Sequence, residues 1–492
     1  MHLHKLISTL KALDAQQVKS LKSFIHSPYF KVPEGAVIMF DYFAPLHPRF
    51  PPNKITPEVI GQVAQFISTP AKQSRVGSEL LEALEQFIAI ENWQKHKHST
   101  TLNRLSGFKE LQLTGQFDKG YEEEMIRLKA CPEQDVQTFF HRHLVTELSF
   151  NGFDAKLNRT SNHNIVSVIQ TLDESYAVKK LRYLCEALNR QQVFGNISYD
   201  AQIPSLLQIL EPYTNEKYPY AYLFVNVYHM LAEKTYEESS LYYQLIKQYA
   251  TNHNSTALPL SIAESMTYAI NHCLTWYSRG YQDAGNEYLW WMEFKIKHNF
   301  LLQHAKMLPI TFRNIVSIAT QNKKNPEWID QIIKIYAPRL PEEHYETNLA
   351  FARGLHSYSL QKHKDAIRFF LLAQAKEEVV FNSIIRRWQW MSAYEYDPYD
   401  TDELLNQLDS YNHYLQRNEK QIQHLSKTFY SFIGYATKLV KANKHKTDEI
   451  LQELKAEEYF PGSNWQIEQL THKNGRTKRM VTQQLLHDHS IV

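Results

Sequence analysis

Glycine is scarce in this sequence, with 14 copies among 492 residues, whereas leucine, alanine, glutamine, lysine and glutamate are plentiful. This balance favours helices over a sheet-rich fold. Cysteine is rarer still: Cys131, Cys185 and Cys273 lie far apart, and no C-x-x-C pair occurs. The pattern excludes a zinc ribbon and a disulfide framework. We therefore predict an all-α fold that is held together by packing alone.

Long apolar runs are also missing. No segment approaches the roughly 20 apolar residues of a membrane span. Residues 1–20 lack the continuous apolar core of a signal peptide. We therefore expect a cytoplasmic protein without a membrane partner.

Motifs of common catalytic sites do not occur either. The sequence contains no G-x-x-x-x-G-K-[ST], G-x-G-x-x-G, H-E-x-x-H or G-x-S-x-G pattern. Histidine pairs such as His96/His98 and His141/His143 are two residues apart, so they point to different sides of a helix. His143 and Glu147 could share a face as half of a metal site, but the sequence shows no further ligands. The prediction is therefore a non-enzymatic protein with no cofactor and no metal.

What the chain does contain is enough apolar material for a large core. Its residues are 43% hydrophobic and 13% aromatic, which excludes disorder as the dominant state. A net charge of +2 favours no particular class of partner, and no pattern sets an oligomeric state.

The order of the segments predicts several helical regions. Near the N-terminus, Asp14 can cap a helix that Pro28 ends, and Pro57 can begin another. Farther on, residues 165–190 are predicted to form a helix pair. The predicted regions are an N-terminal helical subdomain (1–98), an irregular helical segment (99–215), helical repeats (216–460) and a basic C-terminal tail (461–492).

A spacing pattern centres on the stretch that begins at His363. Gly354, Ala366, Phe370 and Ala373 follow one another at offsets of 12, 4 and 3 residues. Small residues at such offsets let two antiparallel helices approach closely, and the aromatic ring fills the gap to the next pair.

Two earlier stretches carry a ring, a small residue and a ring at offsets of 3 and 4. They are Tyr236-Ser239-Tyr243 and Tyr281-Ala284-Tyr288. The small positions lie 45 residues apart (239 to 284) and then 82 apart (284 to 366), and 82 is twice 41. The longer interval leaves room for one more helix pair, which we predict at Pro309–Ala319 and Pro326–Tyr336.

These offsets resemble the packing positions of tetratricopeptide repeats, which are helix-turn-helix units of about 34 residues. The resemblance covers roughly residues 220–375. It departs from the family pattern at Ser239, where alanine is typical, and at Val227 and His272, which stand where the third copy has Gly354. The whole chain is also similar to long bacterial helical-repeat proteins, a similarity that brings no activity with it. The resemblance implies an α-solenoid that binds a protein or peptide partner on its inner wall, and no catalysis.

The resemblance also implies which side chains form that wall, because in the family it is built from the first helix of each unit. An aromatic wall with a few polar groups suits an extended peptide. The alternative is that these side chains pack against a neighbouring helix or a terminus that folds back. Carried over to this sequence, the candidate partner-binding residues are Phe224, Tyr228, Trp276, Tyr277, Asn348, Phe351 and Tyr358.

A second function class is a regulator or a nucleic-acid-binding protein. Arg386 and Arg387 stand beside Trp388 and Trp390, a combination that could bind phosphates and stack on bases. The basic tail would add charge. We rank nucleic-acid binding below the interaction scaffold.

Overall fold

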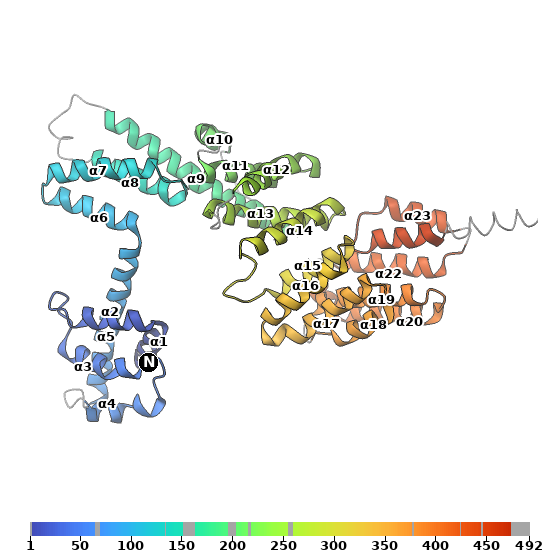
Figure 1. Ribbon diagram of the computed structural model, residues 1–492, viewed down its shortest axis with the longest axis horizontal. Coiled ribbons are helices and arrows are strands. Elements are labelled where there is room, and N and C mark those ends of the chain that lie inside the picture. Colours follow the sequence, from blue (N-terminus) through green and yellow to red (C-terminus); the bar gives the residue numbers. More distant parts are fainter. Residues whose placement is uncertain are drawn as a thin grey trace, which may run out of the picture. The chain divides into compact units, whose positions relative to one another are not determined.

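The structure is a computed structural model that describes residues 2–63, 69–132, 134–150, 163–194, 203–214, 218–253, 259–375, 378–423, 425–443 and 446–473. Over these ranges the chain is helical, and the only β interaction is an isolated bridge between Gln303 and Lys306 (Figure 1). The predicted all-α fold is confirmed for this part of the chain.

The chain forms two compact units. Unit 1 contains residues 1–131 and 137–173, and unit 2 contains residues 132–136 and 174–492. These divisions differ from the four regions expected from the sequence, because helices that follow residue 98 still belong to unit 1.

The first part of unit 1 is a small helical core around the long helix α5 (Pro70–Lys95). Asp14 caps the second helix, with a reciprocal bond from its backbone N–H to the side chain of Gln17, so the predicted cap is present. Leu21 and Leu84 are fully buried in this core. The other helices are α1 (His2–Ala12), α2 (Ala15–Ile25), α3 (Glu34–Phe43) and α4 (Pro57–Val63).

Three further helices of unit 1 carry the cluster of titratable side chains described below. They are α6 (Lys97–Glu110), α7 (Thr114–Lys129) and α8 (Val136–Phe150). Leu105, Phe117 and Val145 form their shared apolar core.

The helix pair predicted at residues 165–190 is wrong. A single helix, α9 (His163–Phe194), covers this region without a break. Its sequence contains neither glycine nor proline, so nothing in it favours a turn.

Unit 2 continues with helices that contact their neighbours in sequence, α11 with α12, α13 with α14, and so on to α22 with α23 (Figure 1). The pair predicted at Pro309 and Pro326 is confirmed, with proline in the first turn of both helices. The helices are α10 (Ile203–Leu210), α11 (Pro219–Ala232), α12 (Tyr236–Asn252), α13 (Leu260–Tyr277), α14 (Gln282–Lys297), α15 (Pro309–Gln321), α16 (Pro326–Tyr336), α17 (Glu342–Ser359), α18 (His363–Leu372), α19 (Val379–Tyr396), α20 (Thr401–Arg417), α21 (Glu419–Ile422), α22 (Ser426–Lys441) and α23 (Thr447–Ala456).

The small and aromatic positions of the repeat pattern lie inside these pairs. Phe370 is fully buried, and its ring fills the space where a Cβ atom on Gly354 would stand, 2.6 Å from the nearest ring carbon. Ser239, which replaces the alanine of the family pattern, is buried with its hydroxyl 3.0 Å from His272 Nε2. The serine therefore keeps the close approach and gains a hydrogen bond.

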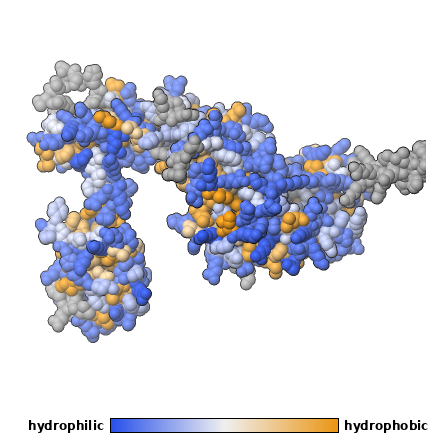
Figure 2. Space-filling model, viewed as in Figure 1, coloured by the Kyte–Doolittle hydropathy of each residue, from blue (hydrophilic) through white to orange (hydrophobic). Residues whose placement is uncertain are grey.

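The visible surface is mostly hydrophilic, and one apolar group of unit 2 lies over α15 and α16 (Figure 2). Ile310 and Ile335 are among the exposed apolar residues of these helices. Among the described residues, no helix combines the length and hydropathy that a membrane span requires.

Candidate functional site

A large cleft of unit 2 lies where the first helices of four successive pairs end. Its volume is about 1150 Å³. Residues at or just beyond the last turns of α13, α15, α17 and α19 form one side of it, and residues 459–473 form the other. The lining includes Tyr277, Lys323, Tyr358 and Glu395 from the first side and Trp465 from the second.

Three of these helices end in the same way, which is why their last turns can form one wall. Gly280, Lys323 and Gln361 each have a positive φ just after the helix. In each case the next N–H bonds back to the carbonyl five residues earlier, at 2.9–3.2 Å. This is the Schellman motif, which closes a helix and turns the chain sharply.

Gly280 meets two requirements at once. Its φ of +100° suits glycine, and a Cβ atom there would lie 2.7 Å from the ring of Tyr459. The side chain of Tyr459 therefore packs directly on the backbone at the end of α13, and residues 459–462 are held against the cleft.

The chain then forms a further helix over residues 463–473, which lies along the cleft. Trp465 Nε1 and Gln469 Nε2 both donate to Glu395 Oε1, at 2.9 and 2.8 Å. Gln466 donates to the carbonyl of Phe432, and Leu470 is fully buried. The region predicted as a basic tail thus begins with a packed helix; residues 474–492 lie outside the described residues.

Arg387 is the most unusual group of the cleft. It belongs to α19, lines the cleft and is only 6% exposed. Its Nη1 donates to the carbonyl of Pro461 at 3.2 Å. No carboxylate among the described residues pairs with it, and burial lowers its pKa from the usual arginine value.

The structure separates the seven residues predicted to bind a partner. Phe224, Trp276, Asn348 and Phe351 are buried in the core, where a partner has no access to them. Tyr228, Tyr277 and Tyr358 are half-buried, and the last two line the cleft. Four of the seven therefore pack against neighbouring helices, which was the alternative to an aromatic binding wall. Tyr277 and Tyr358 remain accessible to a ligand.

The arginine–tryptophan stretch that suggested nucleic-acid binding is also mostly internal. Trp388 and Trp390 are buried, and Trp390 Nε1 donates to the carbonyl of Leu404, so neither ring is exposed for stacking on bases. Arg386 lies over the ring of Tyr414, 4.5 Å from its centroid.

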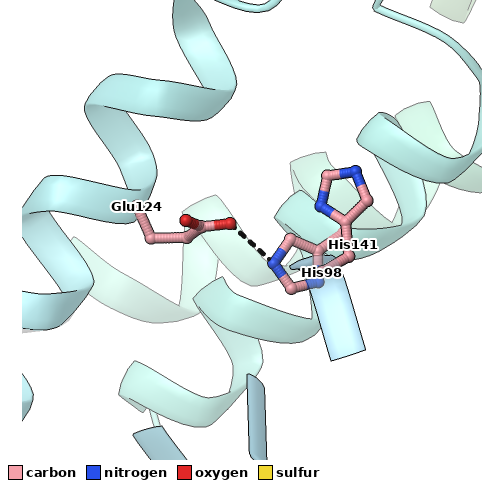
Figure 3. A group of neighbouring side chains, drawn as sticks. All are labelled: His98, Glu124 and His141. Atoms are coloured by element: carbon pink, nitrogen blue, oxygen red, sulfur yellow. Dashed lines mark hydrogen bonds and ion pairs between the residues drawn. The ribbon is translucent and has the colours of Figure 1, made fainter. Parts of the chain in front are cut away.

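Unit 1 contains a second cluster of titratable groups, formed by one residue from each of three helices. His98, Glu124 and His141 come from α6, α7 and α8, and one potential ligand atom of each lies within 4.8 Å of the others (Figure 3). His141 Nε2 is 2.9 Å from Glu124 Oε1. Two histidines and a carboxylate are a ligand set that zinc accepts.

Arg127 already occupies the hydrogen-bonding positions of Glu124 and His98 that a metal ion would need. Its guanidinium bonds both carboxylate oxygens of Glu124, and Nη2 also lies 3.0 Å from His98 Nδ1. Burial alone would raise the pKa of Glu124, but the bonds from Arg127 and His141 outweigh it and lower that pKa to about 2. A metal ion would have to displace the guanidinium, so the arrangement is that of a buried ion-pair network.

Sequence reasoning examined these histidines only as neighbours along the chain. It set His141 and His143 aside because they point to different sides of a helix, and it found no further ligands for His143 and Glu147. The carboxylate that meets His141 stands 17 residues away on another helix. No spacing signal in the sequence connects the three helices.

Comparisons with known proteins give the chain no relative: no family of known proteins, no curated protein and no solved structure matches it. The tetratricopeptide resemblance therefore depends on the residues of this sequence alone.

Proposed function

We propose that the protein is a non-enzymatic interaction scaffold, in which the helix pairs of unit 2 form a solenoid that binds a protein or peptide partner at the cleft. One observation carries the proposal. The wall made by the ends of α13, α15, α17 and α19 already accommodates a helix, residues 463–473 of the same chain.

The contacts of that helix describe what the wall can recognise. At Glu395 it accepts the N–H groups of an indole and an amide, from Trp465 and Gln469. Beside this helix the cleft still offers about 1150 Å³, with Tyr277 and Tyr358 among its lining residues. Aromatic residues with polar ends suit protein recognition, because they bury a large area with little loss of side-chain freedom.

Site-specific photo-crosslinking tests the proposal. A benzophenone amino acid replaces Tyr399, which is 82% exposed and lines the cleft. The matched control carries the same group at Tyr29, which is 83% exposed in unit 1. We expect one partner protein to crosslink in cells from position 399 and not from position 29.

Identical crosslinks from both positions would mean nonspecific capture. No crosslink from position 399 would argue against a partner at the cleft. Either outcome contradicts the proposed scaffold function.

A further inference from the structure

Beyond the scaffold function, the geometry points to a binding site for a small oxyanion, a carboxylate or phosphate compound, with Arg387 as its anchor inside the cleft. This inference does not require the partner protein, because it concerns a ligand of the purified chain. It starts from a charge that the described part of the structure leaves without a counter-ion.

A guanidinium has five N–H donors in a fixed planar arrangement. The described residues supply Arg387 with one acceptor, the carbonyl of Pro461 at 3.2 Å. Burial of a charge costs free energy unless the charge is paired and hydrogen-bonded. Arginine stays protonated in proteins, so it cannot escape this cost by losing its proton.

The groups that act electrostatically on Arg387 do not neutralise it. They are the phenols of Tyr277, Tyr411 and Tyr459, which come from α13, α20 and the segment after α23. Burial raises the pKa of all three phenols, so they remain uncharged at neutral pH.

The acidic residues of the cleft are engaged elsewhere. Glu395 accepts hydrogen bonds from Trp465 and Gln469. Glu468 pairs with Lys323 at 3.0 Å, and His472 lies 3.9 Å from the same oxygen. Neither carboxylate is an ion-pair partner of Arg387, so the positive charge of the guanidinium is available to a ligand.

The cleft has the size and lining for such a ligand. Its volume of about 1150 Å³ is slightly larger than that of typical small-molecule sites, which measure roughly 300–1,000 Å³, so such a ligand would fit. Tyr277 and Tyr358 contribute aromatic surface, and Lys323 and Lys473 also line the cleft. The planar fork of arginine matches the two oxygens of a carboxylate or phosphate, which a lysine cannot do.

Titration calorimetry on the purified full-length chain tests the inference. The probes are inorganic phosphate, citrate and a tetraglutamate peptide, each against a sodium chloride solution of equal ionic strength. We expect phosphate or citrate to bind the wild type, and Arg387→Met to weaken that binding on the order of a hundredfold.

The matched control is Arg386→Met, which removes the same charge one residue away, where the side chain stacks on Tyr414. This variant should bind the probe as the wild type does. Arg387→Lys keeps the charge without the fork and should show intermediate affinity. If Arg387→Met does not fold, the comparison of Arg387→Lys with Arg386→Met decides.

The melting temperature without ligand separates a ligand anchor from a structural arginine. A ligand anchor predicts that Arg387→Met melts at or above the wild-type temperature, because an apolar side chain replaces an unpaired charge. A clear fall in melting temperature together with unchanged affinity would overturn the inference.

Three binding outcomes would also overturn it: no probe binds, both arginine variants lose affinity equally, or only the peptide binds. The last outcome would assign the anion to a protein partner. A negative result here is distinguishable from a negative result for the scaffold function. The calorimetry uses the purified chain without a partner protein, and the crosslinking at Tyr399 is done without added phosphate, citrate or peptide.

Discussion

Two buried charges, one in each unit, have opposite surroundings. In unit 1 the carboxylate of Glu124 is 4% exposed and is bonded by Arg127 and His141. In unit 2 Arg387 is 6% exposed, and its guanidinium has one carbonyl as its acceptor among the described residues. Both residues are buried, yet among the described residues only Glu124 has an opposite charge as its partner.

This difference in pairing predicts different roles: the paired charge affects the stability of the fold, and the unpaired charge affects the binding of a ligand. A buried charge with all its partners contributes to stability, and removal of one partner is costly. A buried charge without a counter-ion destabilises the free protein, and a ligand that supplies the counter-ion recovers that free energy. The comparison therefore predicts that changes at satisfied contacts lower stability, whereas changes at Arg387 lower affinity.

The largest effect on stability is expected at Phe370. This ring is fully buried among α17, α18 and α19, with contacts to Phe351 and Trp388. Phe370→Ala should lower the free energy of unfolding by about 3–5 kcal/mol, because the cavity is enclosed on all sides. Chemical denaturation measures it. Its neighbour Phe369 is only half-buried, so Phe369→Ala is the control and should cost less; equal losses in both variants would mean that the repeat packing is misassigned.

The next effect concerns the satisfied charge itself. Glu124→Gln removes the anion and leaves Arg127 with a neutral partner. We expect a loss of about 2–3 kcal/mol, below the value for a fully buried pair because the Arg127 side chain is 29% exposed. Glu123→Gln, an exposed residue of the same helix, should change stability by less than about 0.5 kcal/mol.

The pH dependence of the same variant gives an independent check. The pKa of Glu124 is lowered to about 2 in the folded state, from 4.5. The folded state therefore binds fewer protons than the unfolded state, so the stabilisation is present above pH 4.5 and is lost as the pH falls towards 2. Urea denaturation at several pH values between 2 and 4.5 gives the free energy of unfolding as a function of pH. This free energy should rise less steeply with pH in Glu124→Gln than in the wild type; an equal rise in both would contradict the ion-pair network.

Helix content and local contacts were predictable from the sequence because they depend on near neighbours. The cap at Asp14, the helix starts at Pro309 and Pro326 and the buried position of Phe370 all follow from short spacings. The predicted break between residues 165 and 190 was wrong, because this stretch contains no glycine or proline that would favour a turn.

The candidate site could be predicted only in part. Tyr277 and Tyr358 do line the cleft, but Phe224 and Trp276 are core residues, because the sequence does not distinguish an aromatic wall from an aromatic core. The cleft also depends on residues 459–473, which return from far along the chain to the ends of α13 and α17. A contact of that length leaves no periodic signal.

The smallest effect on stability is expected at two glycines. It tests whether the packing around Gly354 leaves no room for a side chain, as the contacts of Glu124 leave no unpaired charge. Gly354→Ala places a Cβ atom 2.6 Å from the ring of Phe370, an overlap that costs about 1–3 kcal/mol. Alanine recovers about 1 kcal/mol of helix propensity, so the net loss should be about 0–2 kcal/mol. Gly434→Ala, in α22, has nothing within 4 Å of the new atom and should gain about 1 kcal/mol. Thermal denaturation measures the stability of both variants. Because both gain the same helix propensity, the difference between their stabilities reports the overlap at Gly354 alone. If both variants gained stability equally, the helices of the pair would not be in the close contact that the repeat pattern requires.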